Sequence, residues 1–406
     1  MKASVLKAEQ RNESRNDRSL GIQTYGANND YPQRCKEIAD ASGTGKSCLE
    51  KYAKFIAGRG FTDKFFYKLI INSKGQTNDY LLEQISKDFA NYGGFAIHAN
   101  YNALYEIIEL QHIPFETIRF GKVDKSGYFD LLAIHSDWGR RNQSIKQFRK
   151  EDIIFCNFFN PNPGIIQNQV EAVGGWENYN GQVYYYSSAG DKVYPQPVYD
   201  SVLTDMSTEE GISNVKYRNT RNNFLPAGMI IDKRNHSESE NQESNLEQAL
   251  MQFQGDESAS KLVYVEVGSE EEIPEFKPFD SNNYDKAFDY SEKSVQSNIG
   301  RAFSQPPILR AEDVGANFGA DLMKNAYAFY NSITEPERIV VERVFGELFT
   351  YWYQDKPNAT DDFTILPLDY TYGDLDIKNI PSQILEIMTV NEKRALIGLS
   401  EINELC

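Results

Sequence analysis

Apolar residues change their spacing along the first half of the chain. Within residues 32–57 and 80–92 they recur three and four positions apart, which is the period of an amphipathic helix. Between 95 and 158, short runs alternate apolar and polar positions, as half-buried strands do. Residues 1–30 are polar and predict a loosely ordered arm. The pattern therefore predicts an α+β fold in which helices precede strands.

The strand-rich region predicts both isolated strands and a hairpin. Strands are expected at 95–99, 104–108 and 153–156. Tyr, Asn and Gly recur between Trp176 and Tyr194. A short hairpin is expected there, with Gln182–Tyr186 pairing with Lys192–Tyr194.

The second half of the chain alternates long helices with one small insert. Helices are predicted at about 198–224 and 284–303, and Pro195 and Pro197 precede the first of them. Between these helices, residues 229–280 predict a small α/β unit. Its parts are a strand at 229–232, a helix at 243–253 and a strand at 261–267.

A loop and further helices follow residue 303. A helical segment is expected through Leu322, Ala326, Phe329 and Tyr330. Pro336 suits the first turn of a helix, so a new helix is expected from there to about Trp352. The last predicted helices are 381–388 and 391–399, the second capped by Thr389 or Asn391.

Charge is distributed unevenly along the chain, whose net charge is −17. Residues 232–280 hold 13 acidic and 4 basic side chains, a net charge of −9. Repeated around an axis, these carboxylates would repel phosphate and let DNA slide. Alternatively they would face a basic protein and speed its docking. Simple solubility explains them equally well.

Motifs that would indicate catalysis are weak. Residues 43–47 read Gly-Thr-Gly-Lys-Ser, as in a phosphate loop, but Asp40 stands where Gly or Ala belongs. The residues before it look helical rather than like the required strand, so the plainer interpretation is a small-residue helix contact or kink. The histidines show no ligand spacing: His98, His112, His135 and His236.

The cysteines and the hydropathy indicate where the chain folds. The cysteines form no metal-type pairs and no disulfide framework: Cys35, Cys48, Cys156 and Cys406. This favours a reducing compartment. The N-terminus lacks an apolar signal core. No run approaches the roughly 18 apolar residues of a membrane span, so none is expected.

Several local strings, taken in order, resemble the portal proteins of tailed bacteriophages in their shorter form. The strings are 34–61, 91–96, 299–309 with 315–317, and 391–399. The third is the most specific, because Ile299-Gly300-Arg301 leads through Pro306-Pro307 towards a long helix. The acidic charge of the insert departs from the usual pattern, which leaves its partner contacts open.

The resemblance implies a portal fold with a wing, paired stem helices, a small α/β clip, a tunnel loop and a helical crown. The implied regions are 1–30 arm, 31–197 wing, 198–224 first stem helix, 225–283 clip, 284–303 second stem helix, 304–319 tunnel loop, 320–354 long wing or crown helix, and 355–406 crown.

Candidate site residues follow from these regions. The tunnel loop would line the channel with Glu312, Asp313, Val314, Gly315, Ala316 and Asn317. Gly and Asn tolerate positive φ, so this end of the loop can pivot. Stem contacts to DNA phosphates are expected at Lys216, Arg218 and Arg221, although a solvated helix face also explains them. Clip docking is expected at Glu270, Glu271 and Glu272.

The implied function is structural: a ring, of twelve subunits as the resemblance implies, that passes double-stranded DNA at one capsid vertex. The implied partners are the terminase large subunit, a head-tail adaptor and major capsid or scaffold proteins, with no cofactor, metal or membrane. The chain would act in the virion after assembly in the host cytoplasm. Two alternatives stay open: another head-neck adaptor or scaffold protein, and a nucleotide-binding enzyme that uses Lys46 and Ser47.

Overall fold

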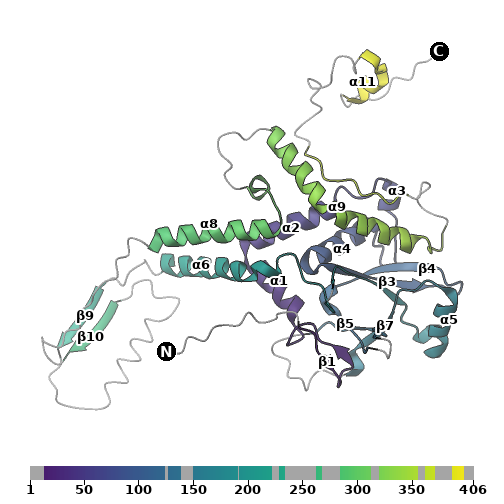
Figure 1. Cartoon of the computed structure of the whole chain (residues 1–406), viewed down its shortest axis with the longest axis horizontal. Coiled ribbons are helices and arrows are strands. Elements are labelled where there is room, and N and C mark those ends of the chain that lie inside the picture. Colours follow the sequence, from purple (N-terminus) through teal and green to yellow (C-terminus); the bar gives the residue numbers. More distant parts are fainter. Residues whose placement is uncertain are drawn as a thin grey trace.

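Two long helices project to one side of a mixed helix and sheet body (Figure 1). The computed structural model describes residues 13–123, 127–138, 150–190, 192–221, 228–233, 262–267, 284–311, 320–354, 362–370 and 386–396. The first body helices are α1 (Tyr31–Ala41), α2 (Gly43–Ala57), α3 (Lys64–Tyr67) and α4 (Asn78–Tyr92). Helices followed by a sheet confirm the α+β class that the apolar spacing predicted.

Six strands form one sheet in the order β4-β3-β8-β7-β6-β5. They are β3 (Gly94–Tyr101), β4 (Ile107–Ile113), β5 (Ile118–Phe120), β6 (Leu132–Ile134), β7 (Ile154–Phe158) and β8 (Gln182–Ser187). Only β7 and β8 run parallel, and α5 (Pro163–Ala172) lies in the connection that a parallel pair needs. The expected hairpin of Gln182–Tyr186 with Lys192–Tyr194 is wrong, because β8 pairs with β3 and β7.

The expected strand at 104–108 starts too early. A turn precedes β4, in which Asn102 Oδ1 accepts hydrogen bonds from two following amides at 2.8 and 2.9 Å. Tyr105 in this turn has a left-handed φ of 65°. A polar side chain that bonds its own backbone in this way favours a turn over a strand.

The N-terminal segment is anchored rather than loosely ordered over its described part, residues 13–30. Its strands β1 (Asn16–Asp17) and β2 (Ile22–Gln23) pair with each other, and Ile22 is fully buried. The buried guanidinium of Arg119 donates to the backbone carbonyl of Asn29 at 2.9 Å and lies 5.4 Å from the Tyr25 ring. Burial lowers the pKa of Arg119 to about 10. The polar composition of residues 1–30 did not reveal the few residues that anchor this segment.

The projection consists of α6 (Leu203–Arg221) and α8 (Tyr284–Ala302), which lie side by side (Figure 1). The first helix begins later than predicted, because Asp200–Val202 form a 3-10 turn ahead of it. Strands β9 (Gly228–Lys233) and β10 (Leu262–Val267) are parallel and confirm the two strands expected in the insert. The helix expected at 243–253 lies outside the described residues.

Helix α9 (Ala320–Phe349) contains Pro336 in its interior, so the expected helix start at Pro336 is wrong. An internal proline removes one backbone hydrogen bond and bends a helix, and α9 bends between its two halves (Figure 1). The guanidinium of Arg338 donates to the carbonyl of Asn331 at 2.6 Å. This bond ties the side chain of Arg338 to the backbone seven residues before it, across the proline.

Aromatic side chains fill the core between α4, the sheet and α9. Phe66 is fully buried, with its ring centroid 4.9 Å from that of Phe61 and 4.7 Å from that of Phe349. Phe89 of α4 stacks on Tyr186 of β8 at 5.5 Å. Much of the high aromatic content therefore serves packing within the body.

The tail includes α11 (Val390–Leu396), which begins at a capping box. The Thr389 amide donates to the Glu392 carboxylate at 2.8 Å, and the Glu392 amide donates to the Thr389 hydroxyl at 3.3 Å. Thr389 is thus confirmed as the cap, whereas most of the helix expected at 381–388 lies outside the described residues. Within the ranges given above, no helix combines the length and the apolar character needed to cross a membrane.

Candidate functional site

Few of the predicted site residues fall in the described part of the chain. Lys216 lies on α6, and its ammonium group forms an ion pair with Glu292 of α8. Arg218 and Arg221 lie in the last turn of α6, and the structure describes only their backbone. The other predicted residues lie outside the described ranges: Glu270, Glu271, Glu272, Glu312, Asp313, Val314, Gly315, Ala316 and Asn317. Any phosphate contact of Lys216 therefore competes with Glu292.

The two projecting helices share a narrow apolar seam. Met206 and Ile212 of α6 and Val295 and Ile299 of α8 are buried. Asn298 Nδ2 also donates across the pair to Asp205 at 3.2 Å. Towards the far end, larger side chains point to solvent, and Tyr290 is 79% exposed. The helices thus hold together near the body and present exposed aromatic surface farther out.

The first turn of α2 is clamped by a carboxylate from α6. Glu209 is buried and accepts hydrogen bonds from the Thr44 hydroxyl at 2.6 Å, the Thr44 amide at 3.2 Å and the Ser42 hydroxyl. A negative group at a helix N-terminus pairs with unsatisfied amides and with the positive end of the helix dipole. A β-carbon at Gly45 would lie 3.0 Å from Met206, so glycine lets α6 approach closely.

This clamp explains the Gly-Thr-Gly-Lys-Ser string. Helix α1 precedes α2 with Ser42 alone between them, so no strand leads into the string as a phosphate loop requires. Ser42 caps α2 by accepting from the Gly45 amide at 2.9 Å, and Lys46 is exposed. The helix N-terminus does bind an anion, but that anion is the protein's own Glu209. The prediction of a small-residue helix contact or kink is confirmed.

Residues 304–311 follow α8, and contacts with α2 and α9 hold them in place. We call this segment the root. Gln305 is buried, and its Nε2 donates to the Cys48 carbonyl of α2 at 2.6 Å and to the Tyr330 hydroxyl of α9 at 3.0 Å. Arg310 donates back to the Gln305 carbonyl. A β-carbon at Gly300 would overlap the Arg310 guanidinium, so glycine lets that side chain lie against α8.

The root is compact through Ala311. A 3-10 turn, Pro307–Arg310, buries Ile308 and Leu309. Ala311 follows with a left-handed φ of 59°. The chain therefore leaves the root in a direction set by packing and by backbone conformation rather than by a slack linker.

The C-terminal part of α2 is held by α9. The Tyr52 hydroxyl donates to Glu337 at 2.7 Å, and Arg338 donates to the Phe55 carbonyl at 2.9 Å. Burial lowers the pKa of Arg338, and neighbouring glutamates partly offset that effect. A cation at a helix C-terminus complements the dipole, as the Glu209 anion does at the other end. Helix α2 is thus held at both ends by charges of the favourable sign.

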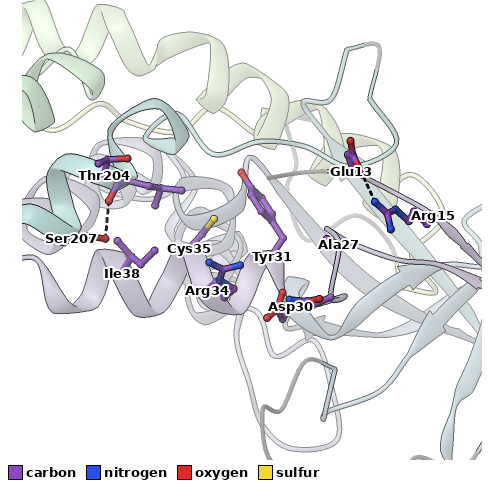
Figure 2. Close-up of a pocket in the computed structure, with 12 residues that line it drawn as sticks. Glu13, Arg15, Ala27, Asp30, Tyr31, Arg34, Cys35, Ile38, Thr204 and Ser207 are labelled. Atoms are coloured by element: carbon purple, nitrogen blue, oxygen red, sulfur yellow. Dashed lines mark hydrogen bonds and ion pairs between the residues drawn. The ribbon is translucent and has the colours of Figure 1, made fainter. Parts of the chain in front are cut away.

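A cavity of about 570 Å³ lies beside the base of the projection, between the N-terminal segment, α1 and α6 (Figure 2). Tyr31, Cys35 and Ile38 of α1 face it, and Tyr31 donates to Asp200 at 2.5 Å. Glu13 and Arg15 at its rim pair with each other at 3.0 Å. These side chains lie where the projection joins the body.

The described histidines have structural partners. His98 Nε2 lies 2.6 Å from the Asn180 carbonyl, and His112 Nε2 lies 2.7 Å from the Asp88 carboxylate. The Phe115 amide also donates to Asp88, at 3.0 Å. In the ranges that the structure covers, no three His, Cys, Asp or Glu residues come together to hold a metal ion.

Sequence reasoning missed the roles of Glu209, Gln305, Arg310 and Arg338. Glu209 lies in a polar helix and has no local signal, because its partners are about 165 residues away in the sequence. Arg338 likewise lacks a local signal, because it donates to the Phe55 carbonyl, 283 residues away in the sequence.

No family model matches the chain, and no curated protein matches it in sequence. Its fold is similar to a chain in the virion of a native gene transfer agent particle, with 15% identity, coverage of 91% of this chain and 94% of that chain, and a TM-score of 0.49. Another similar structure is the neck of a native gene transfer agent particle computed with C12 symmetry, with 15% identity, coverage of 91% and 95%, and a TM-score of 0.46. A third is an HK97 family phage portal protein from Corynebacterium diphtheriae, with 12% identity, coverage of 87% and 99%, and a TM-score of 0.41.

Proposed function

We propose that the chain is the subunit of a portal, a ring through which double-stranded DNA enters and leaves a capsid at one vertex. The observation that carries this proposal is the pair α6–α8, which projects from the body and whose second helix leads directly into the fixed root of residues 304–311. Twelve such pairs arranged about an axis would make a tube, and each root would direct the following residues towards its bore.

Ring closure needs one surface of each subunit to meet a different surface of the next. Helix α9 offers such a surface, since Leu322, Phe329, Ile333 and Ile339 on it are exposed. Exposed apolar residues gathered on one helix favour a protein contact. In the proposed ring this helix and the aromatic-rich body supply much of the contact between neighbours.

The proposed regions keep the order that the sequence suggested. They are the wing (31–197), the stem (198–224 and 284–303), the clip (225–283), the tunnel loop (304–319), the long helix (320–354) and the crown (355–406). The acidic charge of 232–280 would either keep DNA from settling or attract a basic partner. Lys216, Arg218 and Arg221 would touch phosphates weakly, with Lys216 shared by Glu292.

The proposed partners follow from the position at a capsid vertex. The clip would dock the terminase large subunit during packaging and the head-tail adaptor afterwards, and the crown and wing would meet capsid or scaffold proteins. ATP hydrolysis would belong to the terminase, so the chain itself would have no catalytic residue. The ring would assemble in the host cytoplasm and remain in the virion.

Deleting residues 312–317 tests the channel role. We expect the shortened chain to form particles that package or retain DNA poorly, because the segment that reaches into the bore is lost. Quantifying packaged DNA in particles with the deletion measures this directly. Unchanged packaging and retention would contradict the role, and a chain that stays monomeric at all concentrations and in particles would contradict the ring.

A further inference from the structure

Helix α2 contacts the first projecting helix, the root and α9. Its first turn binds Glu209 of α6, and its second turn binds Gln305 at the root. Its later turns bind Glu337 and Arg338 of α9. These contacts come from segments far apart in the sequence, and they meet on one helix of 15 residues.

The contacts are directional polar ones, which distinguishes them from ordinary packing. Apolar side chains can slide past one another, whereas a buried carboxylate that accepts three hydrogen bonds fixes both position and angle. The bond from Gln305 to the Cys48 carbonyl is buried in the same way. Because an α-helix is a stiff element, a shift imposed at one of these contacts reaches the other.

We infer that α2 is a coupling rod, with Glu209 and Gln305 as positioning residues that make the orientation of the root depend on the orientation of the stem. Its importance for DNA rests on the proposed function, since only a portal would place residues 304–319 in a channel. A partner that bends the stem would then move the root without touching it.

Two buried polar atoms lie at the contacts that α2 makes with the root and with α9. The side-chain oxygen of Gln305 is buried and has no hydrogen-bond partner among the described residues, and the same holds for Oε2 of Glu337 on α9. Buried polar atoms are normally satisfied, so these two oxygens keep unused capacity to accept a hydrogen bond. Both atoms lie beside the side of α2 that contacts the root and α9.

Hydrogen exchange of the full chain tests the rod. The reporters are the root amides of Gln305, Leu309 and Ala311, whose acceptors are the carbonyls of Gly300, Pro306 and Ile308. In Glu209→Gln we expect exchange at these amides to rise about fivefold, the change that matches the loss of one helix-cap hydrogen bond. Glu209→Asp, which keeps the charge, should restore part of the protection.

Two control variants separate coupling from general loosening. Glu210→Gln changes the exposed neighbour on α6, and Asp63→Asn removes a carboxylate that caps α3 by accepting from the Phe65 and Phe66 amides. Neither should alter exchange at the root. Should Glu209→Gln fail to fold, Thr44→Val removes one of the hydrogen bonds that Glu209 accepts. It is expected to raise exchange at the root amides by a smaller factor.

The double variant Glu209→Gln with Gln305→Leu completes the test. If α2 couples the two sites, the effects of the two substitutions on amide exchange at Leu309 and Ala311 should be less than additive. Either substitution alone already breaks the connection between α6 and the root. Exchange changes confined to α6 and the first turn of α2 would overturn the rod, even if the protein forms rings. Coupled exchange in a protein that forms no rings would keep the rod and remove its link to a channel.

Discussion

The body and the projection are held together by different kinds of interaction. In the body, fully buried aromatic side chains such as Phe66 and a fully buried Arg119 fix the packing. In the projection, a narrow seam around Val295 and Ile299 is supplemented by polar contacts, among them the ion pair of Lys216 with Glu292. Helix α2 lies between the two and is joined to the projection by Glu209.

This difference indicates a division of roles. The body carries most of the buried apolar area, so it supplies most of the folding free energy. The projection buries less apolar surface and leaves Val215, Tyr217 and Tyr290 exposed, which is the surface that the proposed ring would cover. Substitutions should therefore destabilise the body strongly, the junction moderately and the projection weakly.

The largest effect is expected for Phe66→Ala in the body. Removing a ring that contacts Phe61, Phe345 and Phe349 should lower the free energy of unfolding by about 3–5 kcal/mol. Phe65→Ala is the matched control, because Phe65 is 87% exposed; it should change the value by less than about 0.5 kcal/mol. Chemical denaturation of both variants measures the difference, and similar losses would refute this description of the core.

Arg119→Lys should cost somewhat less, about 3 kcal/mol, because a lysine cannot reproduce the set of hydrogen bonds that the buried guanidinium makes. Those bonds run to the carbonyls of Glu116, Ile118 and Asn29. Limited proteolysis should also cut within residues 13–30 sooner than in the parent. The exposed Arg59→Lys is the control, and equal proteolysis in both would contradict the anchoring of this segment.

Glu209→Gln at the junction should lower the free energy of unfolding by about 1–2 kcal/mol, as expected for weakening a helix cap. The neutral amide still reaches Thr44 but loses the charge that complements the α2 dipole. Thermal unfolding beside the exposed Glu210→Gln gives the comparison. A larger loss than that of Phe66→Ala would place the main source of stability at the junction instead of in the body.

The smallest effect is expected for Lys216→Met in the projection, below about 1 kcal/mol at low salt, because the pair with Glu292 is partly exposed. High salt should reduce the difference further through screening. Denaturation at both ionic strengths, with the exposed Lys293→Met as the control, tests this. A salt-independent loss would show that Lys216 contributes by packing.

The sequence predicted those elements whose signals are local. The spacing of apolar residues located α4 and α8. Short apolar runs in the insert between α6 and α8 located strands β9 and β10. Pairing could not be predicted in the same way, since β8 joins β3 and β7 across long separations in the chain. The helix start expected at Pro336 was wrong because the preference of proline for a first turn is statistical, and here packing carries α9 through the proline.

In the candidate site, too, local features could be predicted and contacts between distant segments could not. The small residues at 43–45 were correctly interpreted as a helix contact, because glycine spacing is a local feature. The side chain that makes this contact specific, Glu209, comes from a distant helix and could be recognised only in three dimensions. Likewise Gln305 was seen as part of a loop string, but its bonds to α2 and α9 depend on the fold.

Imaging the purified full-length protein by cryo-electron microscopy tests the central claim most directly. The account predicts closed rings with an axial hole, in which α6 and α8 of each subunit stand side by side in the wall and the root at 304–311 faces the bore. Particles without an axial hole, or rings in which these helices lie on the outer rim away from it, would contradict the account.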